Sequence, residues 1–184
     1  MKDYLMVMLK PFRGFNRIRN RRGLATPTLY VILTSTAGSI GAYVTSIYRP
    51  EVYIPGVGWV LKTWTLKAYI LGFLMRPLIG LASWLVLSAL SWIIAKVIAE
   101  RDGLRGWLIF TSASTGPRLI LAAPWGLLPV YKVMVIISSV WCLTLTIIAA
   151  KHYYLVNWSK AVSVSSLHVL AGIYNIVVSL KYLM

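Results

Sequence analysis

The chain has 184 residues, 59% of them hydrophobic and 12% charged, and its mean hydropathy is +0.75. Soluble domains are typically about a quarter charged, so this composition excludes an ordinary water-soluble fold and predicts an all-α, polytopic membrane helical bundle. The 19 Lys and Arg residues outnumber four acids and lie mostly between apolar runs, where they would meet anionic lipid headgroups rather than nucleic acid.

Residues 1–25 form a basic arm with apolar side chains at spacings of three or four: Leu5, Met8, Leu9, Phe12 and Phe15. This pattern predicts a short amphipathic segment in the plane of the lipid headgroups; the alternative is a flexible basic tail. The residues expected to bind headgroups are Lys10, Arg13, Arg17, Arg19, Arg21 and Arg22.

The remaining residues, 26–184, are predicted to form a transmembrane domain of five spans. The first, 27–48, is uncharged, and its 22 residues would cover about 33 Å of helix, enough to cross a bilayer. Within it, Ala37, Gly38, Gly41 and Ala42 are small and predict close approach of another helix.

Residues 49–75 combine a turn signal with residues typical of the membrane interface. Pro55-Gly56 indicates a turn, and Trp and Lys residues follow it, which favours an interfacial segment leading into the next helix. A small hairpin capping the outer face is the alternative. The second span is expected over 77–97, with Arg76-Pro77 at the membrane boundary; alternatively, its helix begins near Ala68 and kinks at Pro77.

The last three spans are expected over 106–128, 130–150 and 161–180. Seven of the 19 basic residues precede the first span, and twelve fall on the arm's side of the membrane against seven on the other. The arm is therefore predicted to be cytoplasmic and the C-terminus to lie outside. If the third segment is re-entrant instead, the number of spans falls to four and the C-terminus returns to the cytoplasm.

Pro117 and Arg118 mark a candidate intramembrane site. Arg118 lies 13 residues after Arg105, about 20 Å along a straight helix, and no predicted span contains a carboxylate to pair with it. The sequence favours a structural kink at Pro117 with Arg118 drawn toward the interface, with an anion or lipid site as the alternative.

In the fifth span, polar and small residues share one helical face: Ser165, His168, Gly172, Asn175 and Ser179. In lipid such a stripe should turn inward, so we expect a helix-packing seam rather than a substrate path. All four acids lie outside the spans, and the two histidines are too few for a metal site. No catalytic residues, metal or cofactor are therefore predicted, and a non-enzymatic protein is favoured.

The layout resembles the Yip-domain membrane proteins, five-span proteins named for interaction with Ypt/Rab GTPases. The resemblance rests on Pro11-Phe12-Arg13-Gly14-Phe15 leading to Ile18 in the arm, on Gly116-Pro117 in the third span, and on Trp141 leading to Leu145. The eukaryotic members carry a longer acidic-aromatic extension, so the short basic arm here implies a prokaryotic-type member in a cell membrane and leaves Rab binding in doubt.

Three functions follow as hypotheses. The first is a non-enzymatic scaffold that associates with anionic lipid and with another membrane protein or a second copy of itself. The second is an accessory subunit of a larger membrane complex. The third is a small anion or lipid transporter that uses Arg118.

Overall fold

The computed structural model describes residues 1–20, 23–48, 51–54, 58–61, 66–99, 103–123 and 128–180. Its elements are α1 (Lys2–Leu9), α2 (Pro11–Ile18), α3 (Ala25–Tyr48), β1 (Glu51–Ile54), β2 (Gly58–Leu61), α4 (Leu66–Ala99), α5 (Leu104–Ser114), the 3-10 helix η1 (Gly116–Ala122), α6 (Leu128–Tyr154), α7 (Trp158–Val164) and α8 (Ser166–Leu180). The fold is thus helical, as predicted, apart from one two-stranded hairpin.

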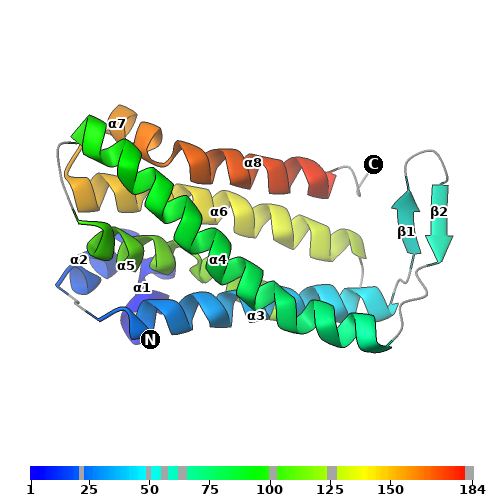
Figure 1. The fold of residues 1–184 in the computed structure, drawn as a ribbon. Helices are drawn as coiled ribbons and strands as arrows, with labels where there is room; N and C mark the ends of the chain where they lie inside the picture. The colour runs from blue at the N-terminus through cyan, green and yellow to red at the C-terminus, as the bar shows by residue number, and fades with distance from the viewer. Residues whose placement is uncertain are drawn as a thin grey trace.

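The long helices lie lengthwise against one another, with α1, α2 and α5 at one end and the β-hairpin at the other (Figure 1). In chain order, α3 leads away from the arm, α4 returns, α5 and η1 lead inward again, α6 returns, and α7 and α8 run back (Figure 1). The closest partners are α3 with α4 and η1, and α6 with α8.

Two described helices are long and apolar enough to cross a membrane, α4 over Ile70–Ala99 and α6 over Val130–Tyr154. Together, α7 and α8 are also long and apolar enough, but they are bent by 70° relative to one another. They make a third span if the two count as one broken span. By length and composition, two or three of the five predicted spans are therefore matched. The fifth was predicted as one continuous helix, but it breaks at Ser165.

The second helix begins earlier than the main prediction placed it. α4 runs for 34 residues and contains Pro77 in its interior, so the helix does not begin at Pro77, and the alternative start near Ala68 is close to the observed Leu66. The membrane boundary at Arg76-Pro77 stays a prediction. At 1.5 Å per residue, α4 is about 51 Å long and exceeds the hydrocarbon thickness of a bilayer.

The hairpin alternative for the preceding segment is confirmed. Strands β1 and β2 pair antiparallel, with Val52 opposite Val60 and Ile54 opposite Gly58. The predicted location of this stretch at the membrane interface stays a prediction. The predicted turn residues Pro55 and Gly56 lie outside the described residues.

The third segment is not the continuous helix expected over 106–128. α5 ends at Ser114, and the chain tightens into η1 through a hydrogen bond from the Thr115 amide to the Ser112 carbonyl (3.1 Å). Gly116 has low helix propensity and Pro117 lacks an amide hydrogen, which together explain the break. Every residue from Trp107 to Ser114 is buried, so near the arm's end of the bundle α5 lies at the centre, enclosed by the other helices.

The arm packs onto this centre, which excludes the flexible tail. Phe15 is fully buried and stacks on Phe110, with ring centroids 5.1 Å apart. Tyr4 is fully buried against Tyr30 of α3. In contrast, Leu9 of the predicted apolar face is 74% exposed, so that face is only partly turned inward.

Close packing of α3 follows the predicted run of small residues. A side chain at Gly41 would meet the backbone carbonyl of Leu121 and the ring of Tyr131, so this position has no room for one. The Tyr131 hydroxyl also donates to the Gly38 carbonyl (3.4 Å). These contacts bring η1 and α6 against α3 and position η1 in the middle of the bundle.

Candidate functional site

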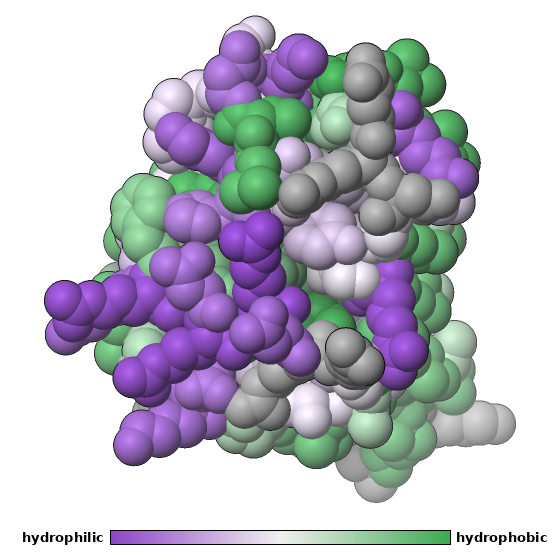
Figure 2. All heavy atoms as spheres, turned by 90° about the vertical axis from the view of Figure 1, so that its left-hand side faces the viewer, coloured by the Kyte–Doolittle hydropathy of each residue, from purple (hydrophilic) through white to green (hydrophobic). Residues whose placement is uncertain are grey.

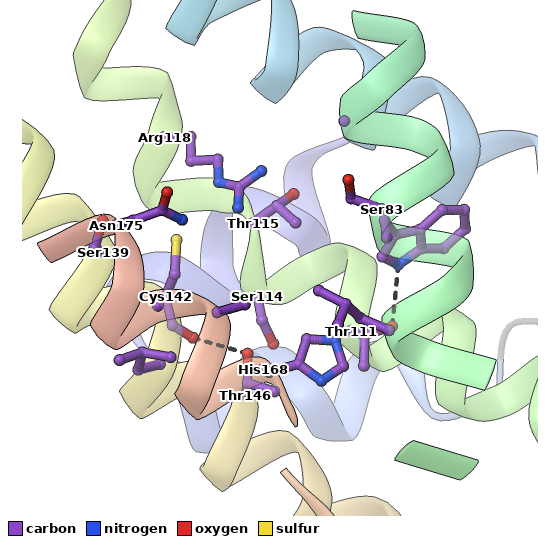
Figure 3. A pocket seen from close by; sticks show the side chains of 16 residues that line it. Ser83, Thr111, Ser114, Thr115, Arg118, Ser139, Cys142, Thr146, His168 and Asn175 are labelled. Carbon is purple, nitrogen blue, oxygen red and sulfur yellow. Dashed lines mark hydrogen bonds between the residues drawn. The ribbon is translucent and has the colours of Figure 1, made fainter. Parts of the chain in front are cut away.

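A pocket of about 100 Å³ with a mixed polar and apolar lining lies between α4, α5, η1, α6 and α8 (Figure 3). Its polar lining comes from all five elements and from the turn between α5 and η1: Ser83 of α4, Thr111 and Ser114 of α5, Thr115 of the turn, Arg118 of η1, Ser139, Cys142 and Thr146 of α6, and His168 and Asn175 of α8. The volume would hold about three water molecules, at roughly 30 Å³ each.

Arg118 reaches this pocket because α5 breaks one turn before it. The structure places the Arg118 guanidinium in the pocket wall next to Cys142, rather than at either end of the bundle (Figure 3). Among the described residues that line the pocket, none carries a carboxylate. The cation therefore faces hydroxyls, a thiol and neutral rings.

Thr111 ties α4 to α5 at the floor of the pocket. Its hydroxyl oxygen accepts a hydrogen bond from the indole Nε1 of Trp84 (3.0 Å) and lies 2.9 Å from the hydroxyl of Ser88. The same hydroxyl donates back to the carbonyl of Trp107 (3.1 Å). All of these side chains are buried, so the network is shielded from solvent.

One of the two ring nitrogens of His168 lies within hydrogen-bond distance of another side chain. Its Nδ1 lies 3.0 Å from the hydroxyl of Ser91, and its ring packs edge-on against Trp107, with centroids 6.3 Å apart. Its other nitrogen, Nε2, is buried and has no hydrogen-bond partner among the described residues. Buried ring nitrogens normally have a partner, so this atom is an exception that calls for a cause.

The predicted polar stripe of the last span divides into two parts. Ser165 is fully buried and its hydroxyl donates to the Thr146 carbonyl (3.4 Å), as a helix-packing seam requires. His168 contacts the hydroxyl of Ser91 in α4, whereas Asn175 lies at the exposed rim of the pocket. The stripe thus contributes both to helix packing and to the pocket wall.

Sequence reasoning therefore named Arg118, His168 and Asn175 separately, and the fold brings them to one pocket. It missed Cys142, Ser83 and the Thr111 network. A signal was present, since Trp84, Ser88 and Ser91 follow one another at spacings of four and three on one face of α4.

The predicted headgroup ligands lie at the arm's end of the bundle, which Figure 2 shows as a face where hydrophilic side chains gather. Lys10, Arg13 and Arg19 are exposed, and Arg17 is 57% exposed while it pairs with Asp3 at 3.9 Å. Arg21 and Arg22 lie outside the described residues. The arm and the pocket are separate, so two features of different chemistry have to be explained.

The residues that the structure describes include no group of three or more His, Cys, Asp or Glu able to hold a metal ion. His152 lies at the end of α6 beside Phe12, with ring centroids 5.1 Å apart, and is not part of the pocket.

Comparison with known proteins gives one match. The family model for the Yip1 domain matches residues 5–179, which include the docked arm, the broken third segment and the bent last helix. Searches of curated proteins and of solved structures returned no match. The match covers nearly the whole chain and agrees with its apolar helices, so this membrane protein belongs to the Yip1-domain family.

Proposed function

We propose that the protein is a non-enzymatic scaffold of a prokaryotic cell membrane that crosses the bilayer five times and holds anionic lipid at its cytoplasmic face. The observation that carries this proposal is the unequal distribution of charge between the two ends of the bundle. At the arm's end lie Lys2, Lys10, Arg13, Arg17, Arg19, Lys96, Arg105, Lys151 and Lys160. The side chains described toward the hairpin end include only Arg76 and Lys132 as cations.

Five crossings are supported by the order of the elements. α3 has 24 uncharged residues, long enough for a span, and α5 with η1 leads from the basic end toward the hairpin end, where α6 begins (Figure 1). The basic end would then be cytoplasmic, because cytoplasmic loops carry the excess of Lys and Arg.

The arm has the two features that an interfacial anchor needs. Leu5, Leu9 and Phe12 are 42%, 74% and 51% exposed and lie on the same short helices as the exposed cations. The arm is also fixed in place, since the indole Nε1 of Trp141 donates to the Met8 carbonyl (3.2 Å). An apolar surface with adjacent cations binds anionic membranes through both burial and charge.

The scaffold role itself would consist of holding lipid and a protein partner, either another membrane protein or a second copy of the chain.

The test removes charge from the arm alone. The triple variant Lys10→Gln, Arg13→Gln, Arg19→Gln is reconstituted with brominated phosphatidylglycerol or phosphatidylcholine, and the relative binding of the two lipids is measured by quenching of tryptophan fluorescence. At about 1 kcal/mol per cation near an anionic surface, the preference for phosphatidylglycerol should fall at least tenfold.

The matched control, Lys96→Gln, Arg105→Gln, Lys160→Gln, removes three exposed cations from the same end of the bundle outside the arm. It should lower the preference less, because these side chains lie on α4, α5 and α7 rather than on the apolar arm. An unchanged lipid preference in the arm variant, or an equal loss in both variants, would contradict the anchoring role of the arm.

A further inference from the structure

The pocket has the composition of an anion site. A guanidinium inside a bundle is costly unless a partner neutralises it, and intramembrane cations usually mark a functional site. Arg118 faces Thr115, Cys142 and Asn175 across the pocket, and the described lining offers it no carboxylate (Figure 3). The guanidinium can therefore donate several hydrogen bonds to a negatively charged ligand.

His168 supplies a second donor from the opposite helix. Its buried Nε2 has no hydrogen-bond partner in the described part of the chain, whereas its Nδ1 lies 3.0 Å from the Ser91 hydroxyl. When the Ser91 hydroxyl donates to Nδ1, the proton of the neutral ring lies on Nε2 and becomes available as a donor. An acceptor in the pocket would thus explain why this nitrogen has no partner among the residues that the structure describes.

We propose that Arg118, His168 and Asn175 bind a phosphate-type oxyanion inside the bundle. The cavity of about 100 Å³ admits one tetrahedral group together with little else. Arg118 supplies the charge, the Nε2 of His168 and the amide of Asn175 supply neutral donors, and the hydroxyl of Ser83 completes the shell.

Two sources of this oxyanion are compatible with the pocket. Ser83 of α4 and Asn175 of α8 are the exposed members of the lining, so the pocket opens between these two helices. A lipid could place its phosphate there from the side, or a free phosphate ion could enter from water. The chemistry recognised is the same in both cases.

The experiment uses the full-length protein purified in a mild detergent and consists of two measurements. Native mass spectrometry before and after delipidation detects a retained phospholipid, and titration of the delipidated protein with inorganic phosphate, followed by thermal melting, detects the free ion. We expect saturable binding of phospholipid, of inorganic phosphate or of both, with the affinity lowered at least tenfold by Arg118→Gln. Arg105→Gln, an exposed arginine outside the pocket, should leave the affinity unchanged.

Two histidine variants separate binding from packing. His168→Asn retains a polar atom near the position of Nδ1 and removes Nε2, whereas His168→Gln approximates Nε2 and loses the bond to Ser91. Ligand affinity should fall more in His168→Asn, and protein stability more in His168→Gln.

Arg118→Met keeps the proposal testable if the glutamine variant folds poorly. Because the unneutralised charge is removed, this variant should melt at a higher temperature than the parent without ligand and should gain nothing from phosphate. The proposal is overturned if folded parent protein retains no phospholipid and binds no phosphate, or if binding is the same in the parent and in Arg118→Gln. These results are independent of the arm variants, so either proposal can fail alone.

Discussion

At the scale of single residues, Thr111 is the pocket side chain whose replacement should lower the free energy of unfolding most. Thr111→Val keeps the shape but leaves the Trp84 indole and the Ser88 hydroxyl, both buried, without their partner. Leaving buried polar groups unsatisfied costs about 1–3 kcal/mol, so the free energy of unfolding should fall by roughly that amount. Thermal melting in detergent, monitored by tryptophan fluorescence, measures the change.

The control for this prediction is Thr144→Val. The Thr144 hydroxyl donates to the carbonyl of Val140 one turn earlier (3.0 Å), and among the described residues no second group loses a partner. Equal destabilisation by both substitutions would show that the Thr111 network contributes no more than an ordinary hydroxyl on a helix.

The site was only partly predictable from single residues. Arg118 was identifiable because an uncompensated cation within a predicted span is rare, and His168 because it lies in a polar stripe. Cys142 gave no such signal, since one cysteine in an apolar run has the composition of an ordinary packing residue. That these side chains meet depends on the break after Ser114, which sequence spacing does not specify.

At the scale of elements, docking of the arm is the feature most open to test. Phe15→Ala removes a fully buried ring that stacks on Phe110, a change that typically costs about 3–5 kcal/mol. The arm should detach, and trypsin should cleave after Arg13, Arg17 and Arg19 much faster than in the parent. Phe12→Ala, at a position that is 51% exposed in the same helix, should change the cleavage rate little. Similar cleavage rates in the two variants would contradict docking through Phe15.

Two prolines show why helix boundaries were harder to predict than helix identity. Pro77 stays inside α4, whereas Pro117 follows the end of α5. The difference lies in the neighbouring residues: Gly116 weakens the helix, and the hydroxyls of Ser112 and Thr115 bond to carbonyls of the preceding turn at 2.8 and 2.7 Å. Arg76 before Pro77 provides neither effect, so α4 continues.

At the scale of the whole molecule, composition alone predicted a helical membrane protein, and the resemblance of its motifs predicted the Yip1-domain family. The hairpin remained one of two alternatives, because residues 49–75 combine turn and interfacial signals. The burial of α5 was not predicted, since an apolar segment looks the same whether lipid or protein surrounds it.

The path of the chain through the membrane is the central claim, because both the cytoplasmic arm and the intramembrane pocket depend on it. The measurement is labelling of single cysteines in intact cells with a membrane-impermeant maleimide, after Cys142→Ala removes the native thiol. With five crossings, Met184→Cys should react from outside, and Asn20→Cys only after the membrane is permeabilised. Reaction of both positions from the same side would mean an even number of crossings and would contradict the account.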